Sequence, residues 1–292
     1  MSFVVFTLLK SLKIIRNLVH SKYSSFLIFI IKMDPPLIIA TENNNLRSVR
    51  ILINSGVDVN ERAEDGMTAL IFAAMNGNLD IMEILLEEDG IDVNAANDEG
   101  STALMFAVSE GHYDAVNFLL DTPNINVNLR DNEGNSALMD AVSTSKAGIL
   151  EELLTDPNVQ INSRDDDGNT LLMIAARQSR PIIVQQLIAA GADVNATNNT
   201  PGIISGTALS MALQRRRGNV VEMLLNAGAT INDADLRLVR RTLLDNQMLR
   251  HQDRVEIMEF DRLRDEAAFM EFSRVQPMDS NILNQIQDFL YF

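Results

Sequence analysis

Residues 98–128 read DEGSTALMFAVSEGHYDAVNFLLDTPNINVN, and much of the remaining chain consists of copies of this stretch. Four glycines recur at a spacing of 34 residues: Gly66, Gly100, Gly134 and Gly168. After each glycine comes a Thr/Ser-Ala/Leu-Leu phrase, then an apolar pair, and finally an apolar residue followed by Asn. A fixed period of this length is typical of solenoid proteins, in which one small unit is stacked repeatedly.

One copy of the repeat can be interpreted as two short helices. Thr102 is a good N-cap, because its hydroxyl can accept a hydrogen bond from an early backbone N–H. From Leu104 onward the apolar residues recur at i, i+3 and i+4, which places them on one helical face. Gly111 can end this helix, and a second helix follows with Val116 and Leu119 on one side. Such short helices cannot bury their apolar faces alone, so the sequence predicts an all-α solenoid in which neighbouring repeats share one core.

At these residues the chain resembles the ankyrin repeat, whose signature is a hairpin turn, a Thr-Pro-Leu-His-x-Ala phrase and two antiparallel helices. The resemblance covers residues 34–232 and implies an ankyrin-repeat solenoid with short β-hairpin loops. Two positions depart from the family pattern. Ala or Leu stands where Pro is usual, and the usual His, which hydrogen-bonds between hairpins in the family, is replaced by other residues: Ile71, Met105, Met139, Met173 and Ser210. We therefore expect a more hydrophobic contact between repeats.

The period divides the chain into six repeats flanked by two other segments. The repeats are residues 34–60, 61–94, 95–128, 129–162, 163–195 and 196–232. The first repeat lacks a hairpin, and we expect Asp34 to cap its first helix, with Pro35 in the first turn. The sixth repeat carries four extra residues within 197–206, where a glycosylation sequon at Asn198 is interpreted as a chance match. Residues 233–292 lose the period and are predicted to form a helical C-terminal cap and a tail.

Charge is distributed unevenly along the chain, whose net charge is −16. Residues 34–232 contain 11 basic and 28 acidic residues, a net charge of −17. Residues 233–292 contain 8 basic and 12 acidic residues, a net charge of −4. Because nucleic-acid binding needs a basic face that displaces counterions, this balance argues against a nucleic-acid partner. It favours a protein partner with a basic surface.

Residues 1–33 differ in composition from the repeats. They contain five Lys or Arg, no Asp or Glu, and two apolar runs at residues 3–9 and 26–31. Neither run reaches the about 20 residues that a membrane-spanning helix needs, and no secretory cleavage site is clear. Three interpretations are open: a basic amphipathic membrane anchor within residues 1–32, an organelle leader, or an extension upstream of a start at Met33. We favour the last, because the repeats begin directly after Met33.

The sequence offers no constellation of residues suited to catalysis. It has no Cys, which removes disulfides, thiolate metal ligands and Cys nucleophiles. Its three His are scattered, and His112 stands where the ankyrin pattern commonly has a structural His. The acidic run 165–167 lacks the loop and bidentate Glu of a calcium site, so we interpret it as a solvated hairpin tip. We therefore expect no catalytic site, no metal site and no cofactor.

The resemblance also implies a binding surface. In ankyrin repeats the hairpin tips and the exposed end of each first helix form the concave, partner-binding face. Carried over position by position, that face comprises Glu64, Asp65, Met67, Met75, Asp98, Glu99, Ser101, Glu110, Asn132, Glu133, Asn135, Asp166, Asp167, Asn169, Arg177 and Arg215. The tips form an acidic stripe, and Arg177 and Arg215 belong to a basic region that also contains Arg180, Arg216 and Arg217.

These observations predict a non-catalytic protein–protein interaction scaffold, monomeric and cytoplasmic. A second hypothesis is a substrate-recruiting adaptor of a ubiquitin ligase. Residues 276–290 resemble the start of an F-box, with apolar residues that would contact a ligase subunit: Ile282, Leu283, Ile286, Phe289 and Leu290. Large viruses and intracellular bacteria often join ankyrin repeats to such tails, which would place the protein in the cytoplasm of an infected host cell.

Overall fold

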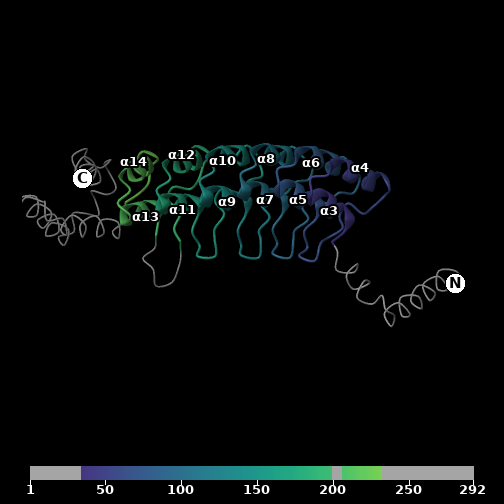
Figure 1. Ribbon diagram of the computed structural model, residues 1–292. Coiled ribbons are helices and arrows are strands. Elements are labelled where there is room, and N and C mark those ends of the chain that lie inside the picture. Colours follow the sequence, from purple (N-terminus) through teal and green to yellow (C-terminus); the bar gives the residue numbers. More distant parts are fainter. Residues whose placement is uncertain (1–33, 199–205, 232–292) are drawn as a thin grey trace, which may run out of the picture. The chain divides into compact units, whose positions relative to one another are not determined.

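The computed structural model describes residues 34–198 and 206–231. This part of the chain forms twelve α-helices and no β-strand (Figure 1). The helices are α3 Pro36–Glu42, α4 Leu46–Asn54, α5 Ala69–Met75, α6 Leu79–Leu86, α7 Ala103–Glu110, α8 Tyr113–Leu120, α9 Ala137–Thr144, α10 Ala147–Leu153, α11 Leu171–Gln178, α12 Pro181–Ala189, α13 Ala208–Gln214 and α14 Gly218–Asn226. Each predicted repeat contains one pair of these helices, and the all-α ankyrin fold expected from the sequence is confirmed.

The helices belong to two compact units, Met1–Asn126 and Val127–Phe292. In the first unit, the first helices of the repeats, α3, α5 and α7, pack side by side in one layer, and the second helices, α4, α6 and α8, form a second layer behind them. The second unit has the same construction, with α9, α11 and α13 in one layer and α10, α12 and α14 in the other. In both units hairpin loops extend from the layer of first helices (Figure 1).

Side-chain caps explain where the first helices begin. Thr102 precedes α7 in an extended conformation, and its hydroxyl accepts a hydrogen bond from the backbone N–H of Met105. Such a cap satisfies one of the helix's unpaired N–H groups. The same cap is present at the start of four other first helices, through Thr68, Ser136, Thr170 and Thr207. The helix α3 differs from our prediction. Its N-cap is Pro35, with Pro36 in the first turn, and Asp34 does not cap it.

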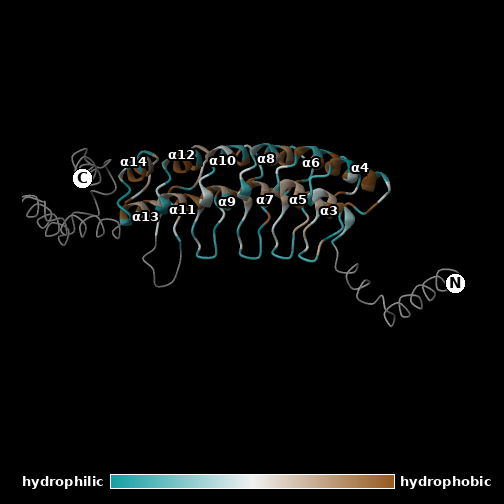
Figure 2. Cartoon of the chain, viewed as in Figure 1, coloured by the Kyte–Doolittle hydropathy of each residue, from teal (hydrophilic) through white to brown (hydrophobic). Residues whose placement is uncertain are grey.

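The core of each repeat is completed by its neighbours. Leu119, from the recurring apolar pair, is fully buried between the layers of the first unit. The residues at the usual His position, Ile71, Met105, Met139, Met173 and Ser210, are all buried as well, and four of them are apolar. Their burial is consistent with the expected hydrophobic contact between repeats. Figure 2 shows the resulting contrast between apolar helices and hydrophilic hairpins.

A ladder of Asn side chains provides a polar link between consecutive repeats. Asn94, which closes the second repeat, donates through Nδ2 to the carbonyl of Asn124 and accepts through Oδ1 from the N–H of Asn126, both at 2.8 Å. Asn60, Asn128 and Asn195 make the equivalent pair of hydrogen bonds to the following repeat. These bonds connect the loops of consecutive repeats and give hydrogen-bond partners to backbone groups outside the helices.

Several sequence predictions lie outside the described residues. These are the leader at 1–33, most of the inserted stretch in the sixth repeat, the C-terminal cap and the F-box-like tail. In the portion that is described, no helix is long and apolar enough to cross a membrane.

We predict that Leu119→Ala lowers the free energy of unfolding by roughly 2–5 kcal/mol, because truncating a buried Leu removes apolar contacts and leaves a cavity. Chemical denaturation monitored by circular dichroism measures this change. Leu79→Ala is the matched control, since Leu79 is 38% exposed on α6 and its truncation leaves no internal cavity. A Leu119→Ala protein as stable as wild type would contradict the packing register.

Candidate partner-binding surface

Each first helix leaves one narrow strip open to solvent. In α7, Ala103, Leu104, Met105, Ala107 and Val108 are buried. The remaining positions, Phe106, Ser109 and Glu110, are half-buried or exposed and lie on one side of the helix at i, i+3 and i+4. The helix α5 repeats this arrangement with Phe72, Met75 and Asn76. This strip, together with the hairpin that precedes each first helix, forms what we call the inner face of a repeat.

The hairpins present acidic side chains at their tips. Gly66 ends a tight turn in which its N–H bonds to the carbonyl of Ala63 at 3.0 Å, and its φ of +78° favours glycine. The turn leaves Glu64 and Asp65 at the tip. The equivalent tip residues are Asp98 and Glu99, then Asn132 and Glu133, then Asp166 and Asp167, and all eight are exposed. The two tip positions of each described four-residue turn are therefore acidic, with Asn132 as the exception.

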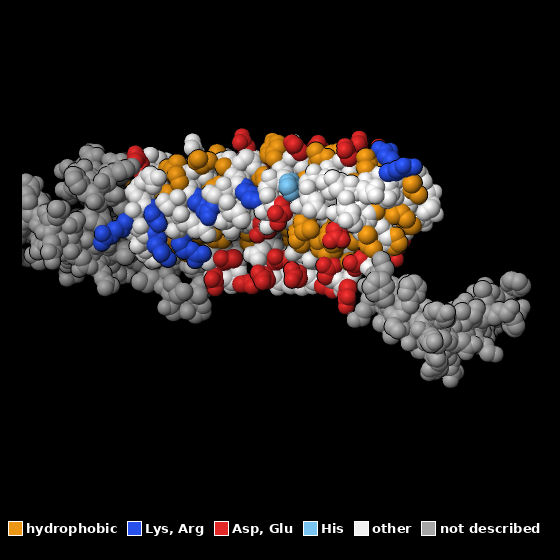
Figure 3. All heavy atoms as spheres, in the orientation of Figure 1, with side chains coloured by type: hydrophobic (Ala, Val, Ile, Leu, Met, Phe, Trp, Pro, Cys, Tyr) orange, Lys and Arg blue, Asp and Glu red, His pale blue; other side chains and the backbone are white. Residues whose placement is uncertain are grey.

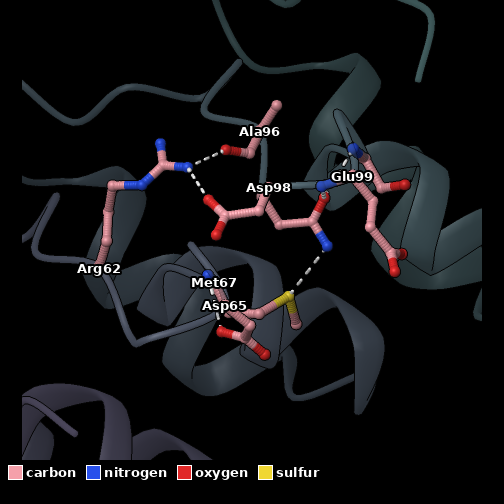
Figure 4. A network of polar contacts seen from close by, with 8 residues as sticks. Arg62, Asp65, Met67, Ala96, Asp98 and Glu99 are labelled. Carbon is pink, nitrogen blue, oxygen red and sulfur yellow. Dashed lines mark hydrogen bonds and ion pairs between the residues drawn. The ribbon is translucent and has the colours of Figure 1, made fainter. Parts of the chain in front are cut away.

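Neighbouring hairpins in the first unit are joined through Arg62 (Figure 4). Its Nη2 donates to the carbonyl of Ala96 at 2.6 Å and lies 3.6 Å from the carboxylate of Asp98. The N–H of Asp98 also donates to the carbonyl of Asp65 at 3.0 Å. The hairpins are thus held in a defined spacing, and Arg62 is already engaged with protein groups.

Two Arg side chains join neighbouring hairpins in the second unit in a similar way. Nη1 of Arg130 donates to the carbonyls of Gly134 and Arg164, at 3.1 and 2.8 Å. Nη1 of Arg164 donates to the carbonyls of Gly168 and Thr197, at 2.7 and 2.8 Å. A guanidinium that bridges its own hairpin and the next one supplies a hairpin-to-hairpin hydrogen bond where this chain lacks the usual His. The sequence analysis did not identify these residues, although Arg recurs at the same repeat position.

The predicted site residues differ in their exposure. The eight tip residues, Glu110, Arg177 and Arg215 are exposed, whereas Met75, Ser101 and Asn135 are half-buried. Met67 and Asn169 are buried, with 5% and 3% of their surface accessible, because they support the hairpins from behind. Asn169 accepts a hydrogen bond from Nδ2 of Asn198 at 2.8 Å. These two residues contribute little surface that a partner could contact.

The sequence analysis missed one recurring position of the inner face. Phe72, Phe106 and Asp140 occupy the same position in α5, α7 and α9, the fourth residue after the capping Thr or Ser. This position lies one turn before the helix-end residues that the family resemblance identified, on the same strip. The i, i+3 spacing of a helix would have been enough to include them.

Asp140 is a half-buried carboxylate in a position that is apolar in the flanking described repeats. The pKa of Asp140 is raised from 3.8 to about 6, chiefly by burial and then by the negative charge of Asp131, while the positive charge of Lys146 opposes the shift. The equivalent residues in the same unit are Ile174 and Met211. Asp140 therefore carries a desolvated negative charge on the inner face of the second unit.

Two further expectations concern single side chains. Nε2 of His112 lies 3.0 Å from the carbonyl oxygen of Met75 in the preceding repeat, as expected of a structural His. Asn198 is buried, and its Oδ1 accepts from the N–H of Gly206 at 2.7 Å. A buried and fully engaged amide does not suit glycosylation, so the structure agrees with a chance sequon. Nowhere in the described ranges do three or more potential metal ligands cluster.

We predict that Asp140→Asn raises the free energy of unfolding by roughly 1 kcal/mol at pH 7.5, after allowance for solvent screening, and changes it little at pH 4. The folded-state pKa exceeds the unfolded value, so the folded state binds more protons between about pH 4 and pH 6. The stability of the wild-type protein therefore falls as the pH rises through this window. At pH values above the window, the full destabilisation by the ionised Asp140 carboxylate is present.

Denaturant unfolding of both proteins at the two pH values measures this difference. Glu151→Gln, at an exposed carboxylate of α10, is the matched control. An Asp140→Asn effect that is the same at both pH values would show that the carboxylate titrates normally.

Comparison with known proteins agrees with this geometry. The family model for ankyrin repeats in three copies matches residues 10–97, 37–131, 92–165 and 138–235. No curated protein matches the chain significantly.

The chain is similar to many solved structures, among them the following three. A chain of the complex between the Bd0816 predatory endopeptidase of Bdellovibrio bacteriovorus and the immunity protein Bd3460 is 31% identical, with a TM-score of 0.57, over 67% of this chain and 99% of that one. The human ASB11 ankyrin repeat domain is 27% identical, with a TM-score of 0.54, over 68% of this chain and 86% of that one. The ankyrin repeat domain of Bcl-3 is 24% identical, with a TM-score of 0.64, over 77% and 98%. The chain belongs to the ankyrin repeat family.

Proposed function

We propose that the chain is a non-catalytic scaffold that binds a partner protein with a basic surface on the inner faces of its ankyrin repeats. The observation that carries this proposal is the recurrence of exposed acidic residues at the tips of four hairpins, with Asn132 as the one exception among eight tip residues. Ankyrin repeats commonly serve as protein-binding scaffolds, and one of the similar structures is a complex of two proteins. The alternative adaptor function rests on residues 276–290, outside the described residues.

The hairpin arrangement suits electrostatic recognition. Glu64, Asp65, Asp98 and Glu99 are exposed on two neighbouring hairpins of the first unit, and only Asp98 forms an ion pair with a described residue, Arg62. Like charges held on adjacent loops add their potentials in front of the inner face. Such a surface accelerates encounter with a basic partner and discourages acidic ones. Any one of these exposed charges contributes little by itself.

We predict that reversing three tip charges, by Glu64→Lys, Glu99→Lys and Glu133→Lys, slows association with the partner and flattens its salt dependence. A partner is first isolated by affinity capture on the wild-type protein, and its association rate is then measured at low and high salt.

The matched control carries the same change of net charge on or directly after the second helices, by Glu83→Lys, Glu87→Lys and Glu151→Lys, all at exposed positions. The control is expected to retain most of the wild-type rate, because these charges lie away from the hairpins. Equal rates and equal salt slopes for all three proteins would refute binding through the acidic tips.

A further inference from the structure

Large apolar side chains form a row along the inner face of the first unit. Ile39, Phe72 and Phe106 occupy equivalent positions in α3, α5 and α7, and all three are half-buried although their neighbours along each helix are buried. Because α3 packs beside α5 and α5 beside α7, the three positions follow one another across the unit. Met75 lies one turn after Phe72 on the same strip. Figure 3 shows hydrophobic side chains gathered over α5 and α7, next to the acidic hairpins.

Acidic side chains flank this apolar row on both sides. The hairpin tips supply Glu64, Asp65, Asp98 and Glu99 on one side. At the opposite ends of α3 and α7, the exposed side chains are Glu42 and Glu110. Both acids stand at helix C-termini, where the helix dipole is also negative, so they add to the negative potential instead of offsetting it.

Among the described residues, the inner face of this unit has one basic side chain, Arg62, that could pair with these acids. The helices α3, α5 and α7 contain no Lys or Arg, and the hairpins between residues 61 and 101 contain only Arg62. Its guanidinium is bonded to the Ala96 carbonyl and paired with Asp98. Arg62 therefore serves Asp98, and this part of the chain offers no second basic side chain to the other acids of the two borders.

We propose that the inner face of the first unit binds a basic amphipathic α-helix of the partner protein, with the apolar stripe of that helix lying on Ile39, Phe72 and Phe106. This inference rests on the proposed function and specifies the chemistry of its partner. An apolar stripe bordered by Lys and Arg complements an apolar row bordered by Glu and Asp, which is the pattern of helix-in-groove recognition. Arg side chains at the border can also stack on the rings of Phe72 and Phe106.

The spacing of the repeats favours a helix over an extended segment. Packed helices lie about 8–10 Å apart, so successive apolar residues of the row recur at about that interval. Seven residues of a helix span about 10.5 Å and return to the same face. In an extended strand, residues on one face recur about every 6.7 Å, which does not match one anchor per repeat. A helix of about two heptads covers the three positions of the row.

The test uses the full-length protein and designed helical peptides of about three heptads. The first has Leu at the heptad a and d positions and Lys elsewhere, and the second has the same Leu stripe with Glu in place of Lys. A third keeps the Lys residues and replaces each Leu by Ser. Binding is measured by fluorescence anisotropy at low and at physiological salt. We expect only the Leu/Lys peptide to bind, with an affinity that weakens as salt rises.

Two variants locate the site, each with a matched control. Phe72→Ala with Phe106→Ala is expected to weaken binding of the Leu/Lys peptide by roughly tenfold or more, since buried aromatic anchors dominate interface energies. Phe118→Ala, which removes a Phe that is 36% exposed on the second helix α8, is expected to have no effect.

Glu64→Lys with Glu99→Lys leaves the helices unchanged and is expected to weaken binding and reduce its salt dependence. Glu83→Lys with Glu87→Lys is the control for charge. Circular dichroism and melting curves establish that each variant is folded.

Several results would overturn the proposal. One is equal binding of the Leu/Lys and Leu/Glu peptides. Another is unchanged Leu/Lys binding by both the folded Phe variant and the Glu64/Glu99 variant. A third result concerns a synthetic peptide of residues 1–33. If this peptide binds, if its binding is lost in the Phe72/Phe106 variant, and if the Leu/Lys peptide does not bind, the occupant is the chain's own basic segment. If no peptide binds but the tip charges still control association of the captured partner, the helix is refuted and the scaffold function stands.

Discussion

The structure depends on the burial of short helices against their neighbours. The first helices are 7 or 8 residues long, too short to be stable alone in water. In α5, five of the seven residues are buried, and this requires α3 and α7 on its two sides and α6 behind it. Small residues such as Ala73 and Ala74 allow these helices to approach closely. Stability is therefore a property of adjacent repeats and not of any one repeat.

The same packing determines where function can reside. Once both sides and the back of a first helix are covered, only one strip of it remains open, and the hairpin beside that strip is the other accessible element. Polar side chains hold these parts at a fixed spacing. The Asn ladder joins the loops after the second helices, and Arg62, Arg130 and Arg164 join the hairpins. Within each unit, hairpins and strips that are connected in this way can present charges and apolar groups at regular intervals, which a single flexible loop cannot do.

A partly buried charge on the inner face is costly to the folded state. Asp140 illustrates this, because burial and the nearby Asp131 raise its pKa to about 6 and penalise the ionised form at neutral pH. Its apolar counterparts Ile174 and Met211 carry no such penalty. A residue that lowers stability but lies on an accessible face is consistent with a role in binding. A cationic partner would offset the electrostatic repulsion between Asp140 and Asp131 that is present in the folded protein.

Much of the fold was predictable from spacing alone. The 34-residue period, the capping Thr and Ser and the buried apolar pairs are local or periodic features, so the sequence by itself determined the repeat register, the helix pairs and the burial of Leu119. The acidic tips were also recognised, because the turn residues that expose them are local. Only the tertiary structure decided which residues face outward. Met67 and Asn169, which were predicted to lie on the binding face, are buried, whereas Phe72 and Phe106, which were not predicted, are half-buried on that face. The physical reason is that exposure depends on the side chains of adjacent repeats, as do the pKa of Asp140 and the carbonyl partners of the bridging Arg residues.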